Sequence, residues 1–490
     1  MKWFSSLKKN KIETIFLILI LLLASFLRFY RISDYMIFLG DEGRDVLIVK
    51  RMIVDHKFTL LGPIASVAPF HLGPIYYYLM LPFLWIFNLN PVGPAIMVAL
   101  FGVATVFLVY LTGKKFFSSF VGLIASFLYA ISPLVIIHSR SSWNPNVVPF
   151  FALLSIYLLK LEEEKKKIYC LGIVGFLLGI CLQLHYICVF LIAIVVSYFL
   201  FFMPQRKKII SYFYLLGGFV LGWSPFLAFE FRHNFVNLKN LYWFLTSGEK
   251  VGMEKNFWII VKDVFIRSFN DLVVAKNDIL LKILIFLFIF LFLKLITQKN
   301  KNYIFLFLWF LGGVFLFGFF RGTIHSYYLV FMFPAPFLII GLILEKLKEI
   351  NKIGWILSSL IFFSLIWVNI KASPLKQTPN RQLYQTQEIA KFILEKSEGK
   401  PFNLALISSN NTYFPYFYFL EVWKKPVGII KPPHVDPERK TVTDQLFVIC
   451  EEKNCQPVGH PLWEIAGFGM AKITQEWEHL GIKIYKLEHL

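Results

Sequence analysis

The chain has 490 residues, of which 57% are hydrophobic and only 16% are charged, and its mean hydropathy is +0.63. Soluble domains carry about 25% charged residues, so this composition excludes a water-soluble fold. The formal net charge is +20. Its Lys and Arg residues stand in clusters between long apolar runs, as expected of cytoplasmic loops, so we expect no nucleic-acid partner.

The first apolar run begins at Ile12 and ends near Tyr30, and it lacks a small-residue cleavage site. We therefore predict a retained membrane helix rather than a cleaved signal peptide. If each later basic cluster is cytoplasmic, the helices come in pairs, giving about eleven spans with a cytoplasmic N-terminus. The predicted spans are residues 12–30, 93–112, 119–137, 146–160, 168–184, 186–203, 209–229, 279–297, 303–320, 327–344 and 353–371.

Residues 74–90 form an apolar stretch that does not fit this alternation, because counting it as a span would invert everything that follows. The stretch is short and contains Pro82 and an aromatic row. Tyr and Trp favour the membrane interface, so we predict a helix lying in the outer interface. With this topology, every Asp and His before residue 372 falls on the outer side. Titratable chemistry is therefore expected at one membrane face.

Residues 372–490 have a mixed polar composition without a span. The apolar spacing predicts a helix over 381–396 and strands over 402–408, 445–450 and 482–487. Cys450 and Cys455 either form a disulfide or remain two free thiols. The predicted fold class is an all-α polytopic membrane domain (1–371) followed by a small extracytoplasmic α/β domain (372–490).

The first outer loop, residues 31–73, is rich in polar residues, including the adjacent carboxylates of Asp41 and Glu42. Adjacent residues point in different directions on a regular element, so these two acids are expected to have different partners. From Glu42 onward, apolar and basic residues alternate with the spacing of an amphipathic helix on the membrane surface. Asp41 stands near the start of this helix, as a helix cap or as a reactive group.

Further polar and aromatic residues mark the other predicted outer turns. Together they provide the carboxylates, imidazoles and guanidinium groups needed to bind an anionic headgroup and transfer a proton. The middles of the spans carry almost no ionisable residue, which argues against an ion-coupled transporter. There is no P-loop, no GxGxxG after a strand and no HExxH motif. The candidates are His71, Tyr76, Tyr77, Arg140, Asn144, His185, Glu230, His233, Arg321 and His325.

The stretches FLGDEGRDVLIVKRMI, FHLGPIYYYL and SRSSWNPNVVPFFALLSIYLL, all within residues 38–160, resemble the GT-C glycosyltransferases in order and spacing. The nearest resemblance is to the branch of protein O-mannosyltransferases and aminoarabinose transferases. It implies a multi-pass enzyme of the cell membrane that moves a hexose or pentose from a polyprenyl-phosphate donor. Transfer would occur on the outer face, with inversion, to a hydroxyl of a lipid, glycan or protein.

By the same resemblance, Asp41 is the base that activates the acceptor hydroxyl, and Glu42 orients the first-loop helix or the acceptor. Positive charge must stabilise the departing phosphate. The candidates for phosphate binding are Arg321, Arg140, His71 and His325. For acceptor or sugar binding they are Tyr76, Tyr77, Asn144, His185, Glu230 and His233.

The sequence departs from the aminoarabinose branch at Leu72-Gly73, where that branch has a Glu-Lys pair. This departure argues against aminoarabinose as the sugar. It leaves a divalent metal as an open possibility. A non-enzymatic alternative is a translocase or channel for lipid-linked glycans, whose outer residues only bind headgroups. A third is a scaffold whose exported C-terminal domain binds a partner.

Overall fold

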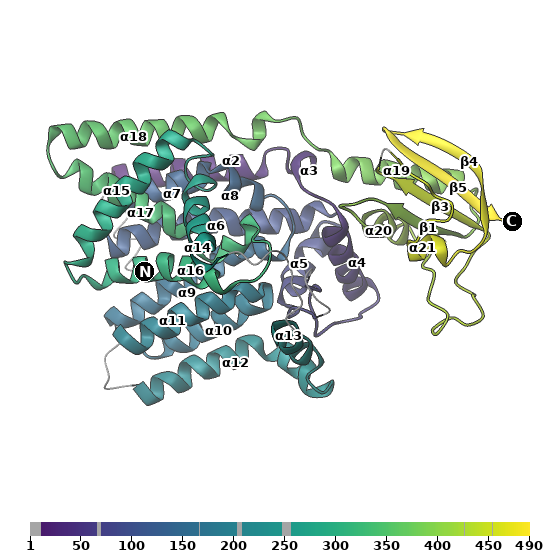
Figure 1. The fold of residues 1–490 in the computed structure, drawn as a ribbon, viewed down its shortest axis with the longest axis horizontal. Helices are drawn as coiled ribbons and strands as arrows, with labels where there is room; N and C mark the ends of the chain where they lie inside the picture. Colours follow the sequence, from purple (N-terminus) through teal and green to yellow (C-terminus); the bar gives the residue numbers. More distant parts are fainter. Residues whose placement is uncertain are drawn as a thin grey trace. The chain divides into compact units, whose positions relative to one another are not determined.

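A computed structural model describes residues 11–65, 70–165, 167–202, 208–246, 256–425, 427–452 and 454–490. The chain divides into two compact units (Figure 1). The first unit comprises Met1–Tyr30, Thr59–Leu79 and Ala95–Thr378. The second comprises Arg31–Phe58, Met80–Pro94 and Pro379–Leu490. The domain limits predicted from the sequence, 1–371 and 372–490, remain predictions.

The first unit is built from helices. The helical elements are α2 (Lys11–Phe29), α6 (Val92–Phe116), α7 (Ser119–Ile131), α8 (Pro133–His138), η1 (Asn144–Val147), α9 (Val148–Lys165), α10 (Tyr169–Leu184), η2 (Tyr186–Cys188), α11 (Val189–Phe202), α12 (Lys208–Arg232), α13 (Val236–Thr246), α14 (Phe257–Asn270), α15 (Asp278–Ile296), α16 (Lys301–Leu316), η4 (Phe317–Phe319), η5 (Ser326–Met332), α17 (Pro334–Lys348), α18 (Lys352–Lys371) and η6 (Pro374–Lys376).

The predicted all-α membrane fold is confirmed. Within the described residues, seven helices are long and apolar enough to cross a membrane, and η5 with α17 forms an eighth, bent by 62°. The remaining predicted spans coincide with shorter apolar helices: α7, α10 and η2 with α11. The aromatic stretch predicted to lie in the interface forms a separate helix, α5 (Ile75–Ile86). Residues 206–207, which belong to one predicted basic cluster, lie outside the described residues.

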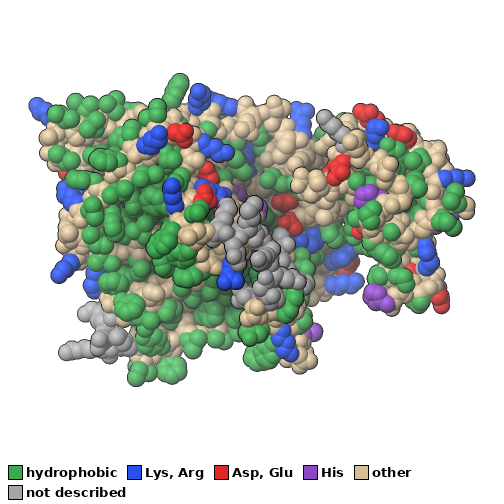
Figure 2. All heavy atoms as spheres, viewed as in Figure 1, with side chains coloured by type: hydrophobic (Ala, Val, Ile, Leu, Met, Phe, Trp, Pro, Cys, Tyr) green, Lys and Arg blue, Asp and Glu red, His purple; other side chains and the backbone are tan. Residues whose placement is uncertain are grey.

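Several helices expose apolar side chains that water would not tolerate. In α2, α12, α15 and α18, only 17 to 33% of the most apolar window is buried within the protein. Phe213, Phe286 and Trp367 are 72%, 71% and 68% exposed. Hydrophobic side chains cover much of the visible helical surface (Figure 2). These faces are therefore lipid-facing in a multi-pass membrane protein.

Glycines let α10 and α12 approach closely. A Cβ on Gly175 of α10 would lie 2.0 Å from the carbonyl oxygen of Leu215, and one on Gly222 of α12 would lie 2.2 Å from that of Phe176. Gly175 and Gly179, like Gly218 and Gly222, stand four residues apart on one helix face. Small residues at this spacing bring two membrane helices into backbone contact.

Helices α13 and α14 were not predicted from the sequence, which indicated only an outer loop between the spans ending at 229 and starting at 279. Both are short, with 11 and 14 residues. Their amphipathic pattern is interrupted by polar residues, so neither reads as a span. Residues 247–255 between them lie outside the described residues.

The second unit combines first-loop helices with a five-stranded sheet of order β2-β1-β3-β5-β4. β1 pairs in parallel with β2 and β3, whereas β5 runs antiparallel to β3 and β4. Its elements are α3 (Ile32–Tyr35), α4 (Gly40–Val54), α19 (Gln382–Lys396), β1 (Phe402–Ile407), α20 (Phe414–Val422), β2 (Val427–Gly428), β3 (Gln445–Cys450), α21 (Trp463–Ala466), β4 (Ala471–His479) and β5 (Ile482–His489).

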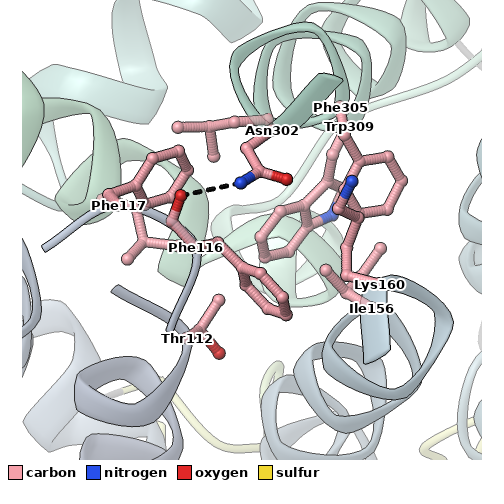
Figure 3. Close-up of a pocket in the computed structure, with 10 residues that line it drawn as sticks. Thr112, Phe116, Phe117, Ile156, Lys160, Asn302, Phe305 and Trp309 are labelled. Atoms are coloured by element: carbon pink, nitrogen blue, oxygen red, sulfur yellow. Dashed lines mark hydrogen bonds between the residues drawn. The ribbon is translucent and has the colours of Figure 1, made fainter. Parts of the chain in front are cut away.

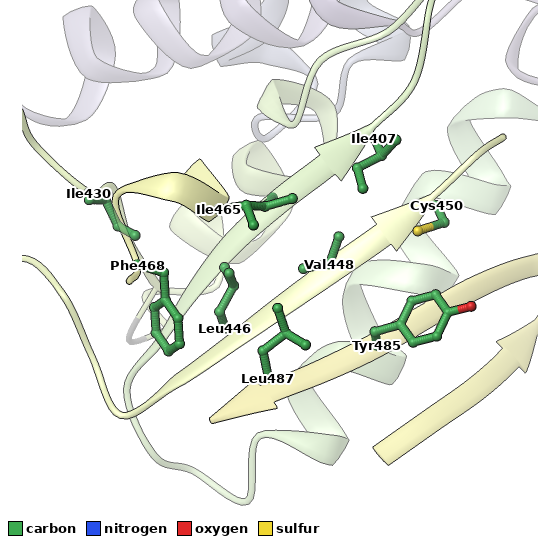
Figure 4. Packing of buried hydrophobic residues seen from close by; sticks show 10 residues of the cluster. Ile407, Ile430, Leu446, Val448, Cys450, Ile465, Phe468, Tyr485 and Leu487 are labelled. Atoms are coloured by element: carbon green, nitrogen blue, oxygen red, sulfur yellow. The ribbon is translucent and has the colours of Figure 1, made fainter. Parts of the chain in front are cut away.

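The predicted C-terminal helix and three strands are all present, and the small α/β fold is confirmed. The central strands β1 and β3 are buried throughout. One face of the sheet forms a core in which Leu446, Val448 and Leu487 pack with Phe468 (Figure 4). Strand β4 was not predicted, because this mostly exposed edge strand, AKITQEWEH, lacks an apolar alternation. Cys450 and Cys455 form a disulfide, which decides the alternative left open by the sequence.

Candidate functional site

Helix α4 of the second unit begins with a buried carboxylate. Oε2 of Glu42 accepts a hydrogen bond of 3.0 Å from the backbone N–H of Leu39, so Glu42 caps the helix N-terminus. Its side chain is buried. Burial, reinforced by the negative charges of Asp41 and Asp45, raises the pKa of Glu42 to about 7, although the Leu39 N–H opposes the shift.

Asp41 points away from Glu42, as expected for adjacent acids on a helix. Its side chain is 41% exposed, and Oδ1 lies 2.9 Å from Nη1 of Arg44. The same guanidinium contacts Oδ1 of Asp45 at 2.9 and 3.0 Å, and the Asp45 side chain is fully buried. Arg44 therefore holds two carboxylates, of which only that of Asp41 is open to solvent. The capping role considered for Asp41 falls to Glu42.

The C-terminal part of the chain holds α4 from one side. Nζ of Lys50 lies 3.1 Å, and Nη2 of Arg51 lies 2.7 Å, from the carboxylate of Glu421 in α20. Toward the other end of α4, a Cβ on Gly43 would lie 2.4 Å from the backbone nitrogen of Pro415. The helix that carries Asp41 is therefore packed directly against α20.

In the first unit, a buried carboxylate organises the segment around His71. Glu230 is fully buried, and its oxygens accept hydrogen bonds from the side chain of Asn237 and from the N–H of Leu238, at the start of α13. Oδ1 of Asn237 accepts the backbone N–H of His71 at 2.9 Å. Tyr186 donates its hydroxyl to the carbonyl of His71. The predicted residues Glu230 and His71 thus share one network through Asn237.

The imidazole of His71 lies 3.1 Å from the carbonyl of Gly62 through Nδ1. A carbonyl only accepts, so Nδ1 of His71 carries a hydrogen and donates it to Gly62. His233, by contrast, is exposed, stacks on Phe229 with ring centroids 3.9 Å apart, and donates to the Phe229 carbonyl. His233 directly follows the last residue of α12, and its ring contacts Phe229.

Other predicted residues are buried in packing roles. Tyr76 and Tyr77 are 0% and 1% exposed, and the Tyr76 hydroxyl lies 2.8 Å from Oγ of Ser142. Arg140 is also buried, and its guanidinium donates to the carbonyls of Leu27 and Tyr30 at the end of α2. A cation at this helix end complements the macrodipole of α2.

Three short 3-10 helices, η1, η2 and η5, bring an aromatic cluster together. The side-chain amide of Asn144, in η1, donates a hydrogen bond of 2.6 Å to the carbonyl oxygen of Leu184. Helices η1 and η2 both pack against η5. The Trp143 and Tyr327 rings meet edge to face at 4.4 Å, and His185 lies against Tyr327 at 5.9 Å. We name Trp143, His185 and Tyr327 the aromatic cluster.

The loop before η5 carries the exposed candidates Arg321 and His325. Gly322 has φ 137°, a conformation that favours glycine, so the chain turns sharply after Arg321. His325 stacks on Tyr327 at 5.4 Å with the rings 10° apart. Arg267 of α14 donates to the carbonyl of Ile324 at 2.8 Å and so supports the loop. Sequence reasoning missed Arg267, because α14 itself was not predicted.

Among the described residues, no group of three or more His, Cys, Asp or Glu is arranged to hold a metal ion. A small cavity lies elsewhere in the first unit, among α6, α9, α16 and α17, where Asn302 donates to the carbonyl of Phe116 (Figure 3). Lys160 lines this cavity and pairs with Glu163, which also contacts Lys301 at 3.0 Å. None of the candidate residues lines it.

The comparisons with known proteins concern the fold of the chain. The family model described as dolichyl-phosphate-mannose-protein mannosyltransferase matches residues 69–229. The chain superposes on apo ArnT from Cupriavidus metallidurans with a TM-score of 0.67 and 9% identity, covering 96% of this chain and 98% of that one. The chain has the GT-C glycosyltransferase fold. The resemblance predicted from the sequence is therefore confirmed.

Two further structures share this fold. ArnT from Cupriavidus metallidurans bound to undecaprenyl phosphate gives a TM-score of 0.62 with 11% identity, over 96% of this chain and 97% of that one. The oligosaccharyltransferase AglB from Archaeoglobus fulgidus, in complex with an inhibitory peptide and a dolichol-phosphate, gives 0.55 with 13% identity, over 91% and 70%. No curated protein sequence matches the chain.

Proposed function

We propose that this protein transfers a sugar from a polyprenyl-phosphate donor to an acceptor hydroxyl on the outer face of the membrane, with inversion. Two of the solved structures with this fold hold a polyprenyl phosphate, named as undecaprenyl phosphate and as dolichol-phosphate. The observation that carries the proposal is the orientation of Asp41. Glu42 and Asp45 are buried, whereas the Asp41 carboxylate is solvent-accessible and is oriented by Arg44.

In the proposed reaction, Asp41 takes the proton from the acceptor hydroxyl as its oxygen attacks the anomeric carbon. The bond between that carbon and the phosphate oxygen breaks, and polyprenyl phosphate leaves with the electron pair. Attack from the face opposite the leaving group inverts the anomeric centre. A positioned general base contributes about 10²–10⁴-fold to such a step.

The leaving phosphate requires positive charge or hydrogen-bond donors. We assign this role to Arg321 and His325, which are exposed on one loop. Arg140 already donates to two carbonyls, and Nδ1 of His71 is already engaged by the carbonyl of Gly62. These contacts favour the loop before η5. We also propose that the acceptor hydroxyl belongs to a lipid, a glycan or a protein. The N-terminus is proposed to lie in the cytoplasm.

The test is sugar transfer by Asp41→Asn in membrane vesicles supplied with polyprenyl-phosphate-linked sugars. We expect transfer to fall at least 100-fold. The control Asp34→Asn removes another first-loop carboxylate, which pairs with Arg31 on the surface, and should keep transfer. Unchanged transfer by Asp41→Asn refutes the assignment. Passage of labelled lipid-linked sugar across vesicles without any product would support the translocase alternative instead.

A further inference from the structure

The aromatic cluster of Trp143, His185 and Tyr327 has a chemistry that differs from that of the charged loop beside it. The three rings come from separate turns, 42 residues or more apart in sequence, and are partly exposed. Tyr328 closes the cluster from inside, 5.3 Å from His185 and only 7% exposed. Partly exposed aromatic rings packed against a buried one leave apolar ring surface at the edge of the protein.

The tautomer of His185 follows from one hydrogen bond. The backbone N–H of Ile187 donates to Nδ1 of His185 at 3.1 Å. Nδ1 is therefore an acceptor and carries no hydrogen, so in the neutral ring the hydrogen sits on Nε2. Tyr327 and Tyr328 pack against the partly exposed His185 ring, and desolvation lowers the pKa of His185 to about 4, which keeps the ring neutral near pH 7. His185 thus offers one uncharged N–H donor next to two aromatic rings.

We propose that the aromatic cluster is the subsite for the transferred sugar ring, that it takes an uncharged sugar, and that Nε2 of His185 donates to a sugar hydroxyl. This inference rests on the proposed function. The apolar C–H face of a sugar packs on an aromatic ring, and its hydroxyls need polar partners. A neutral donor among aromatic rings satisfies a hydroxyl but does not neutralise a charged substituent.

The neighbouring residues give this subsite a direction. His325 stacks on Tyr327. Arg321 lies on the same loop, four residues before His325. In a polyprenyl-phosphate sugar, the phosphate is attached directly to the anomeric carbon. The sugar would therefore lie on the cluster while its phosphate lies toward the cationic loop. Both groups belong to the first unit.

The test compares two ligands on purified full-length protein in lipid nanodiscs: polyprenyl phosphate, and polyprenyl phosphate carrying mannose. Their ratio of dissociation constants isolates the contribution of the sugar. We expect Trp143→Ala and His185→Phe each to weaken binding of the mannose-carrying lipid about tenfold while changing binding of the bare lipid less than twofold. Trp258→Ala removes an exposed aromatic of α14 and should leave both constants unchanged.

The ring-preserving variant Trp143→Phe keeps a stacking surface and should retain most of the preference, so the test survives if Trp143→Ala does not fold. A third ligand, polyprenyl phosphate carrying a positively charged amino sugar, should bind the wild-type protein no better than the bare lipid. Equal losses for the mannose-carrying and bare lipids, or no loss, would overturn the subsite. The proposed function fails separately, if the wild-type protein forms no glycosylated product.

Discussion

Gly43 of α4 lies so close to Pro415 of α20 that no side chain fits between them. A Cβ at residue 43 would stand 2.4 Å from the Pro415 nitrogen and 2.7 Å from its Cα. Real Cβ atoms do not approach a neighbour below 3.0 Å, so the two helices would have to separate. The close packing of α4, the helix that carries Asp41, against α20 therefore requires a glycine at residue 43.

We expect Gly43→Ala to destabilise the protein by about 1–3 kcal/mol, since overpacking against backbone atoms cannot be relieved by a rotamer change. The measurement is the thermal midpoint in detergent. Gly217→Ala is the matched control, because it also replaces a helical glycine but its Cβ meets nothing within 4 Å. That control should be neutral or stabilising, by up to about 1 kcal/mol. Equal midpoints for the two variants would show that the α4–α20 contact is loose.

Glu421 links α20 to two cations of α4. Burial works against ionisation of Glu421, but hydrogen bonds from Arg51 and Lys50 outweigh it and lower the pKa of its carboxyl. Glu421→Gln should cost about 1 kcal/mol of stability, since the pairs are only partly buried. A lowered pKa means that the ion pairs stabilise the fold above about pH 4.5 and that this contribution is lost on further acidification.

The control for Glu421 is Glu388→Gln, which breaks the exposed pair with Lys391 in α19 and should change stability by less than about 0.5 kcal/mol. Because α4 carries Asp41, Glu421→Gln should also lower kcat for sugar transfer more than it raises KM. A variant that loses stability while kcat stays at the wild-type value would show that Glu421 is structural only.

The raised pKa of Glu42 predicts that the stability of the fold depends on pH with the opposite sign. Its pKa is about 7 in the folded protein, whereas an unfolded Glu titrates near about 4.3. The folded state then binds more protons between these values, so this residue makes the protein less stable as pH rises from about 4.5 to 7. The loss amounts to roughly 3 kcal/mol.

The variant Glu42→Gln stays neutral and can still accept the Leu39 N–H, so its midpoint should lose this dependence. Thermal midpoints at pH 5 and pH 8 are the measurement. Glu388→Gln, which leaves Glu42 in place, should keep the wild-type slope. A Glu42→Gln variant with the same slope as the wild type would contradict the raised pKa.

The disulfide between Cys450 and Cys455 closes a short loop at the end of β3. A loop of this length predicts a stabilisation of about 2 kcal/mol through the unfolded state. Replacing both cysteines with serine should lower the midpoint accordingly, and a reducing agent should then have no further effect. In the wild-type protein, thiol labelling after unfolding without reductant should detect Cys170, Cys181 and Cys188 only.

The sequence predicted the membrane fold well because a span has a strong signal: a long apolar run between basic clusters. The strands β1 and β3 were found for a related reason, since buried central strands read as apolar runs. In β5, IKIYKLEH, apolar residues alternate with charged ones, which is the other strand pattern. The edge strand β4 and helices α13 and α14 were missed, because partly exposed elements mix polar and apolar residues without a clear period. Arg267 was missed with α14.

Among the candidate residues, the sequence predicted what depends on neighbours along the helix. It anticipated that Asp41 and Glu42 diverge, which follows from helix geometry alone. It did not indicate Asn237, which joins His71 to Glu230 across more than 160 residues. Nor did it select Trp143, whose meeting with Tyr327 depends on how η1 and η5 pack. Such contacts arise from tertiary structure and leave no local pattern.

The second unit is assembled from three stretches of the chain, residues 31–58, 80–94 and 379–490. A chimera that exchanged only the C-terminal stretch with a relative would give α4 a foreign partner in place of α20. Gly43, Lys50 and Arg51 would then face residues with which they were never matched. A working chimera should therefore exchange the first-loop helix α4 together with the C-terminal stretch. Substitutions in one of these stretches should also limit the substitutions that the other tolerates.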